Sequence, residues 1–202
     1  MTGGWRFGVL QDGPPASPDA PLVMKIGGSL LARPGWPEAV SGLLAATAGP
    51  RVLVVGGGPV VDGLRAIDAA APRPAAAMHW LAIEALGITA RLVAEATGLP
   101  LAAAPDTREI VVLDAPRWLR SDPRLPEGWH VTSDSIAAVV AARAGGGLLL
   151  AKSEPPSATD LRHLAAAGWV DAHFPEVAGT VGRITWAAWI SPTPPERPVA
   201  GR

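Results

Sequence analysis

The chain has 202 residues with 17 basic and 18 acidic side chains, a formal net charge of -1, and 49% hydrophobic residues. This length can bury one good core but is short for two ordinary ones, so a single domain is expected. The near balance of charge leaves no basic stripe that could hold a nucleic-acid backbone. The chain has no cysteine, which excludes disulfides, thiol nucleophiles and zinc-thiolate sites and is compatible with a cytoplasmic protein.

The two ends of the chain have the composition of tails. Residues 1–20 contain Gly, Pro and Asp without a basic start or an apolar run, which predicts a flexible N-terminal tail and no signal peptide. Residues 191–202 are rich in proline and predict an extended C-terminal tail. No apolar stretch reaches the roughly 20 residues of a membrane helix, so residues 21–190 are expected to form one domain away from the membrane.

Short apolar runs alternate with helical patterns along this domain. The alternation predicts a three-layer α/β/α sandwich whose mainly parallel sheet is covered on both faces. Strands are expected at Leu22–Ile26, Val52–Val55, Ile110–Leu113, Leu148–Ala151 and Ile184–Trp189.

Helices are expected between these strands. Pro37 and Pro59 fit first helical turns, which predicts helices over Pro37–Ala48 and Pro59–Ala70. A helical spacing of apolar residues covers Ala75–Thr97, with Gly87 as a possible kink. Two further helices are predicted, one capped by Ser133 and running through Arg143, the other capped by Thr159 or Ser157 and running through Ala166.

Only two of the 17 basic residues are lysines, and each stands where an apolar run ends. Lys25 ends the run before Gly27, and Lys152 ends the run that begins at Leu148. The chain lacks Asn and Tyr, as expected of a GC-rich coding bias that replaces lysine by arginine wherever either serves. A lysine ammonium is a compact point charge that can follow a phosphoryl group. The alternative is two surface lysines retained by chance.

Two glycine turns follow the first two predicted strands. Lys25 leads into Gly27, Gly28 and Ser29, and the second strand leads into Gly56, Gly57 and Gly58 ahead of Pro59. Turns without side chains let backbone N–H groups approach an anion, and neighbouring parallel strands open onto one crevice. The first turn lacks the ending of a P-loop, and Val61 stands where a dinucleotide fingerprint needs glycine. The pair of turns therefore predicts a different kind of phosphate site.

These turns resemble those of the amino acid kinase superfamily, which includes aspartate, glutamate and uridylate kinases. The resemblance implies a carbamate kinase-like fold and an ATP-dependent kinase that uses Mg²⁺. The stretch Val131–Ala138 looks like the segment in which the family places an aspartate at a helix start, here Asp134. The resemblance implies catalytic roles for Lys25, Asp134 and Lys152, and phosphate or nucleotide binding by Gly27, Gly28, Ser29, Gly56, Gly57, Gly58 and Ser153. The alternative for Asp134 is a helix cap that favours the dipole.

Within the superfamily, the chain is most similar to the small kinases that phosphorylate (aminomethyl)furanylmethyl phosphate in methanofuran and methylofuran synthesis. The similarity lies in the short length, His79-Trp80, Ser133–Ser135 and Gly168–Pro175. It implies a phosphorylated acceptor whose binding residues are Asp62, Arg65, His79 and Ser133, and a homo-oligomer. Asp62 and Arg65 could instead form an exposed ion pair, and His79 could pack at a helix start. Trp169, Trp186 and Trp189 are expected in the core or an interface, not as a base-stacking platform.

The nucleotide-binding half departs from the family pattern. Ser153–Ser157 stands where relatives carry a Thr-Asp-x-x-Gly-x-Tyr segment, and no later glycine-methionine-lysine segment is found. The chain therefore has either a reduced adenine pocket or, as a non-catalytic member of the fold, only a nucleotide or oxyanion site. A uridylate or isopentenyl phosphate kinase would differ in the acceptor alone. Metal ligands cannot be assigned from the sequence.

Overall fold

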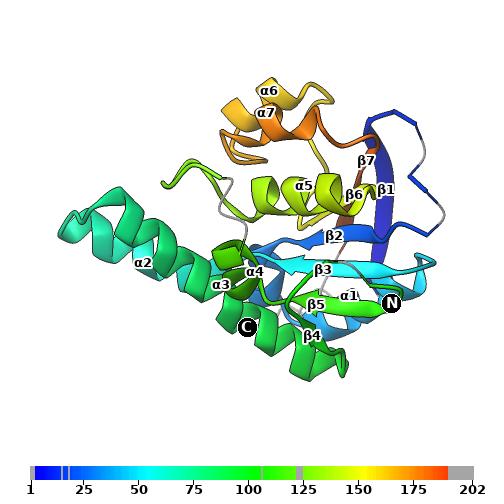
Figure 1. The fold of residues 1–202 in the computed structure, drawn as a ribbon, viewed down its shortest axis with the longest axis horizontal. Coiled ribbons are helices and arrows are strands. Elements are labelled where there is room, and N and C mark those ends of the chain that lie inside the picture. Colours follow the sequence, from blue (N-terminus) through cyan, green and yellow to red (C-terminus); the bar gives the residue numbers. More distant parts are fainter. Residues whose placement is uncertain (1–2, 15, 18, 106, 122–124, 191–202) are drawn as a thin grey trace, which may run out of the picture.

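The computed structural model describes residues 3–14, 16–17, 19–105, 107–121 and 125–190. A seven-stranded sheet runs through it in the order β1-β7-β6-β2-β3-β5-β4 (Figure 1). Its strands are β1 (Gly4–Gln11), β2 (Leu22–Ile26), β3 (Arg51–Val55), β4 (Leu101–Ala102), β5 (Ile110–Leu113), β6 (Leu148–Lys152) and β7 (Ile184–Ile190). All neighbours pair in parallel except β1, which is antiparallel to β7. The five predicted strands are confirmed to within one residue at each end.

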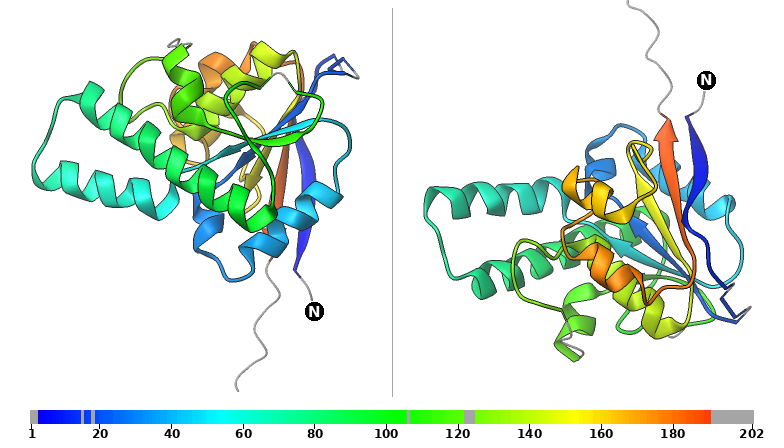
Figure 2. Two further views of the ribbon diagram at one scale, coloured as in Figure 1. Left: turned by 60° about the horizontal axis from the view of Figure 1, so that its bottom comes forward. Right: turned by 90° about the horizontal axis from the view of Figure 1, so that it is seen from above.

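Helices cover both faces of the sheet, which confirms the predicted three-layer α/β fold (Figure 2). One face carries α5, α6 and α7, and the other carries α1 and the second half of α3. The helices are α1 (Trp36–Ala45), α2 (Gly58–Ala70), α3 (Ala75–Thr97), α4 (Ala115–Ser121), α5 (Ser133–Ala144), α6 (Leu161–Ala166) and α7 (Phe174–Ala178), with a 3₁₀ helix η1 (Gly28–Ala32) after β2. The short η1, α4, α7 and β4 were not predicted, because so few residues carry no clear periodicity.

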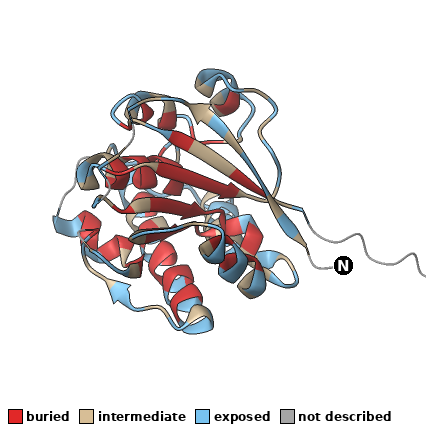
Figure 3. Cartoon of the chain, turned by 90° about the vertical axis from the view of Figure 1, so that its right-hand side faces the viewer, coloured by how far each residue is buried: buried red, intermediate tan, exposed pale blue. Residues whose placement is uncertain are grey.

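The central strands are buried on both faces, as Figure 3 shows. Side chains of a strand alternate between the two faces, so each strand feeds two cores. Val23 packs in the core with Ile136 of α5, while Met24 and Ile26 pack with Leu43 of α1. The next residue on the Val23 face is Lys25. Strand parity therefore sends this lysine toward α5.

The predicted flexible tail at residues 1–20 is wrong for Gly4–Gln11, which forms the edge strand β1. Its Trp5 Nε1 donates a hydrogen bond to the carbonyl oxygen of Ala39 on α1 at 2.8 Å. The Trp5 ring also meets the ring of Trp189 on β7, with centroids 5.3 Å apart. Alternating Trp5, Phe7 and Val9 carried the strand signal, which glycine and proline in the flanking residues obscured. The predicted C-terminal tail at 191–202 lies outside the described residues.

Two helices are capped by residues other than those predicted. Thr132, not Ser133, caps α5, because its extended backbone lets Oγ1 accept from the Asp134 N–H at 3.4 Å. Asp160, not Thr159 or Ser157, caps α6 by accepting from the His163 N–H at 2.7 Å. The helix predicted over Pro37–Ala48 ends at Ala45.

Helix α3 runs as one element through Gly87. A Cβ at Gly87 would lie 2.8 Å from Cγ of Pro116, so glycine here admits α4 and does not serve as a break. By length and hydropathy α3 could cross a membrane, yet half of its apolar window is buried inside the protein. A single helix of this kind is weak evidence for a membrane span.

Replacing Trp5 with Ala should lower the free energy of unfolding by about 2 kcal/mol, because the substitution removes a partly buried indole and its hydrogen bond to α1. The exposed neighbour Arg6 on the same strand provides the control, since Arg6→Ala should change stability by less than about 0.5 kcal/mol. Urea unfolding measures both. Equal, small effects would mean that β1 contributes little to the folded state.

Candidate active site

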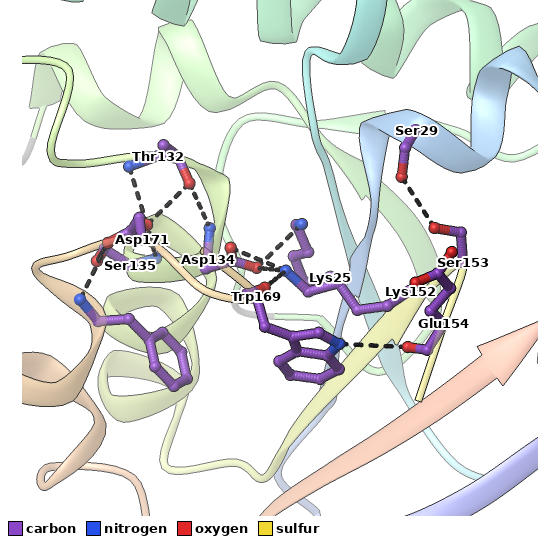
Figure 4. A network of polar contacts seen from close by, with 11 residues as sticks. Lys25, Ser29, Thr132, Asp134, Ser135, Lys152, Ser153, Glu154, Trp169 and Asp171 are labelled. Carbon is purple, nitrogen blue, oxygen red and sulfur yellow. Dashed lines mark hydrogen bonds and ion pairs between the residues drawn. The ribbon is translucent and has the colours of Figure 1, made fainter. Parts of the chain in front are cut away.

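Two buried lysines and one aspartate form the centre of the site. Lys25 lies opposite Leu150 in the β2–β6 ladder, and Lys152 lies two residues beyond Leu150 on the same face. Both side chains therefore point toward the first turn of α5, where Asp134 lies (Figure 4). Lys25 Nζ is 2.9 Å from Asp134 Oδ1, and Lys152 Nζ is 2.8 Å from Oδ1 and 2.9 Å from Oδ2. The structure thus brings together the three predicted catalytic residues.

Burial makes this ion cluster electrostatically strong. Lys25 and Asp134 are only 5% and 4% exposed. Burial would raise the pKa of Asp134, but the ammoniums of Lys152 and Lys25 outweigh it and hold that pKa below its ordinary value. Burial also lowers the pKa of Lys152 to about 8; Asp134 opposes this shift and Lys25 adds to it. With all three groups charged, the cluster carries a net charge of +1.

Trp169 is a second partner of Lys152, besides Asp134. Lys152 Nζ donates to the carbonyl oxygen of Trp169 at 2.6 Å and lies 5.0 Å from the centre of the Trp169 ring. The indole Nε1 in turn donates to the carbonyl oxygen of Glu154 at 3.3 Å. The Lys152 ammonium is thereby fixed between α5 and the loop after α6.

The two glycine turns touch each other backbone to backbone. A Cβ at Gly28 would lie 2.1 Å from the Gly58 nitrogen, and one at Gly58 would lie 2.3 Å from the Gly28 oxygen. Gly58 also has a φ of 49°, which disfavours any other residue. The Gly56 N–H donates to the Ile26 oxygen at 2.8 Å and locks the second turn to β2. The N–H groups that begin η1 and α2 lack intrahelical acceptors by helix geometry, which suits them to bind an anion.

Both turns open into one cavity of about 370 Å³. Asp134 does not line the cavity but is paired with the two lysines that do. Every other predicted site residue lines it: Lys25, Gly27, Gly28, Ser29, Gly56, Gly57, Gly58, Asp62, Arg65, His79, Ser133, Lys152 and Ser153. Ser29 Oγ and Ser153 Oγ lie 3.4 Å apart across its mouth. The cavity therefore joins the lysines to the glycine turns in one space.

The far end of the cavity lies between α2, α3 and the segment before α5. Arg65 forms an exposed ion pair with Asp62 at 3.3 Å, as the alternative interpretation held, and its guanidinium lies 5.2 Å from the centre of the Trp129 ring. Trp129 Nε1 donates to Asp68 Oδ2 at 2.8 Å. His79 is buried, with Nδ1 3.4 Å from the Gly128 oxygen. These contacts hold residues 127–131 against α2 and α3, where the segment forms one wall of the cavity.

The three tryptophans named from the sequence have different positions. Trp186 packs on Gly8 of the edge strand, and Trp189 on Trp5, as expected of core or interface residues. Trp169 packs against the core, as expected, and it also lines the cavity beside Lys152. Its place at the cavity was not predictable because it depends on how the loop after α6 folds back on β6.

The sequence did not single out Asp171 as a functional residue, although Asp171 lies within Gly168–Pro175, one of the stretches that carry the family resemblance. This buried carboxylate accepts hydrogen bonds from Thr132 and Ser135 at the start of α5. An acidic residue inside an apolar segment, after Trp169 and Val170, was the available signal. Trp129 was missed as well, because its contact with α2 is purely tertiary.

Among the described residues, no group of three or more His, Cys, Asp or Glu side chains could hold a metal ion. Magnesium in phosphoryl transfer usually sits on one or two carboxylates and on substrate phosphates. Glu154 is the carboxylate next to the lysines that lines the cavity with an exposed side chain. The donor set thus suits a cation that arrives with a polyphosphate.

Comparison with known proteins agrees with this geometry. Residues 20–112, which include both glycine turns, match the sequence profile of the amino acid kinase family. Uridylate kinase from Archaeoglobus fulgidus superposes with a TM-score of 0.56 at 14% identity, over 83% of this chain and 90% of that one. UMP kinase from Ureaplasma parvum gives a TM-score of 0.56 at 14% identity, over 80% and 84%. No curated protein sequence gives a significant match. The fold is that of the amino acid kinases, and the profile supports the superfamily that the turns indicated.

Replacing Asp134 with Asn should impair folding as well as turnover, because the buried ammoniums lose their counter-charge. Breaking a buried ion pair costs about 3–5 kcal/mol. The variant can relieve this cost by deprotonating Lys152, whose pKa in the folded state should fall below its present value of about 8. The unfolded variant then binds more protons than the folded one, so its free energy of unfolding rises with pH.

Urea unfolding at pH 6, 7 and 8 should therefore show a stability gap to the parent that narrows as the pH rises. Asp160→Asn makes the same substitution at an exposed cap, and its small gap should stay constant. A gap for Asp134→Asn that is also constant with pH would contradict the charge role and leave a purely structural one.

Proposed function

We propose that the protein is an ATP-dependent phosphotransferase that converts a small phosphorylated acceptor into a diphosphate. The observation that carries the proposal is the convergence of Lys25 and Lys152 on Asp134, beside a cavity walled by two glycine turns. The net positive charge of that cluster suits an anionic ligand. The amino acid kinase profile and the fold support the reaction class.

The reaction is an in-line displacement at the γ-phosphorus of ATP. An oxygen of the acceptor phosphate forms the new P–O bond while the bond to the β-phosphate oxygen breaks, and ADP leaves with those electrons. Lys25, Lys152 and the N–H groups of the glycine turns stabilise the negative charge on the transferred group. Magnesium, held by the nucleotide phosphates with Glu154 as a nearby carboxylate, would neutralise further charge.

The acceptor needs no general base. A phosphate is already ionised near neutral pH, so its oxygen can attack without losing a proton. Asp134 is occupied by two ammoniums at 2.8 to 2.9 Å, which leaves it to position the lysines and not to accept a proton. This arrangement favours a phosphate acceptor over an alcohol, which would require a base.

The far end of the cavity is proposed to bind the acceptor. His79, Arg65 and Ser133 offer polar contacts there, and Asp62 could meet an amine. Apolar side chains of Val61, Ala82, Ile83 and Leu86 line the rest of that end and suit a small ring. On the resemblance stated above, we propose (aminomethyl)furanylmethyl phosphate as the acceptor, and a cofactor pathway of the methylofuran type.

The cellular setting is part of the proposal. We infer a cytoplasmic enzyme, since ATP and small phosphorylated metabolites are found there. A homo-oligomer is supported by exposed Leu81, Ile88 and Leu92 along α3. No nucleic acid or membrane partner is proposed, because the cavity is sized for small molecules.

Replacing Lys25 with Met should lower kcat/KM roughly thirtyfold or more. This corresponds to a loss of about 2 kcal/mol or more of transition-state stabilisation, the scale of one lost oxyanion donor. Lys152 remains to neutralise Asp134, so the thermal unfolding midpoint should change little. Arg91→Met, an exposed cation on α3 away from the cavity, is the matched control and should keep parental turnover. Turnover of Lys25→Met within a few-fold of the parent would show that Lys25 does not act on the phosphoryl group.

The acceptor is tested by ADP release with four candidates: (aminomethyl)furanylmethyl phosphate, isopentenyl phosphate, uridylate and acetylglutamate. The furan phosphate should have the highest kcat/KM, and the carboxylate the lowest, because buried donors left without an acceptor phosphate cost several kcal/mol. A preference for acetylglutamate would overturn the diphosphate reaction, and a preference for uridylate would replace the furan acceptor. Absence of turnover with all four, combined with nucleotide binding by calorimetry, would favour a non-catalytic binding protein.

A further inference from the structure

Among the described residues, Asp171 is a heavily hydrogen-bonded side chain that the proposed reaction leaves unused. It is 9% exposed, and its carboxylate accepts six hydrogen bonds. Oδ2 accepts from Thr132 N at 2.9 Å, Thr132 Oγ1 at 2.8 Å and Ser135 N at 3.0 Å. Oδ1 accepts from Ser135 Oγ at 2.5 Å, His173 N at 3.2 Å and Phe174 N at 3.0 Å.

These bonds join the two segments that hold Lys152. Thr132 and Ser135 flank Asp134, so Asp171 fixes the start of α5 on which Asp134 lies. On its own segment, Asp171 lies two residues after Trp169, whose carbonyl oxygen accepts from Lys152 Nζ. Figure 4 shows Asp171 beside Thr132 and Ser135, with Asp134 between this group and the lysines. The carboxylate is therefore the link between the two partners of the Lys152 ammonium.

We propose that Asp171 is a positioning residue for phosphoryl transfer, because its carboxylate sets the separation of the Asp134 carboxylate and the Trp169 carbonyl that together hold Lys152. This inference rests on the proposed function of the cavity. Asp171 touches neither the cavity nor the reacting atoms, and its effect on turnover passes through Lys152.

The proposal requires a carboxylate and not merely a polar side chain. An ionised carboxylate has acceptors alone, which matches the six donors around it. An asparagine would turn an N–H₂ group toward two backbone N–H donors, whichever way the amide lies, and lose their hydrogen bonds. Asp171→Asn keeps the volume of the side chain and should release the start of α5 from the Trp169 segment.

Lys152 itself reports this release, because the charges of Asp134 and Lys25 act on its ammonium. Glu154 lines the same cavity, and His173, whose backbone N–H donates to Asp171, has its Nδ1 3.1 Å from Oε2 of Glu176. The His130 ring lies 6.2 Å from that of His173. Of these groups, Asp134 stabilises the charged lysine, and withdrawal of Asp134 should lower the pKa of Lys152 below about 8.

The experiment is a carbon-13 NMR titration of protein labelled at the lysine ε-carbons. The chain has two lysines, so two signals are expected, and Lys152→Arg assigns them. In Asp171→Asn the Lys152 signal should titrate at a lower pH than in the parent, and kcat/KM should fall about 100-fold, the scale of a catalytic group displaced by about 1 Å. The control Leu43→Ala removes a buried side chain on the opposite face of the sheet and should lower the melting temperature without moving the titration.

A Lys152 titration unchanged in Asp171→Asn, with a lowered melting temperature like that of Leu43→Ala, would overturn the proposal and leave Asp171 a structural residue. If Asp171→Asn does not fold, Ser135→Ala removes the 2.5 Å hydrogen bond while keeping the carboxylate. Its Lys152 signal should shift in the same direction by a smaller amount, and no shift would likewise overturn the proposal. The titration needs no substrate, so it judges Asp171 even if none of the four acceptors is turned over.

Discussion

The buried pairing of one carboxylate with two ammoniums is the constraint on which the site depends. Burying an uncompensated charge is costly, and Asp134 compensates only one of the two lysines. The cluster therefore keeps one positive charge in excess, which suits an anionic ligand. Burial lowers the pKa of Lys152 to about 8, and the second ammonium, that of Lys25, adds to this shift. The second buried ammonium thus lowers the stability of the folded protein, and an anionic ligand that pairs with it can restore this stability.

Strand parity turns this constraint into a fold. Lys25 and Lys152 lie on adjacent parallel strands and on the same face, so both reach the single helix start at α5. The glycine turns follow the same strand ends, and their backbones meet at Gly28 and Gly58. Parallel pairing places all these groups at one edge of the sheet. The groups proposed to bind phosphate therefore follow the strand ends, while the end of the cavity proposed to bind the acceptor depends on α2 and α3.

Much of this was predictable from residues whose chemistry is local. Strand ends are indicated by the apolar runs, the two lysines and the glycine turns. These features predict five of the strands. What could not be predicted depends on partners far away in sequence. The strand that contains Trp5 depends on contacts of this side chain with Trp189 and Ala39. The role of Asp171 depends on its hydrogen bonds with Thr132 and Ser135. Thr132 displaced Ser133 as the cap through a backbone conformation that no residue type dictates.

Helix α2 shows how freely one half of the site could diverge. None of its residues is buried, yet Val61, Asp62 and Arg65 line the end of the cavity that is proposed to bind the acceptor. Substitutions at exposed or half-exposed positions usually change stability by less than about 0.5 kcal/mol. Gly28 and Gly58, the first residue of α2, by contrast have no room for a single added carbon. Mutation can therefore explore new acceptors along α2 at almost no cost in stability, while the phosphate end stays fixed, so descendants of this fold could differ in substrate and still share one chemistry.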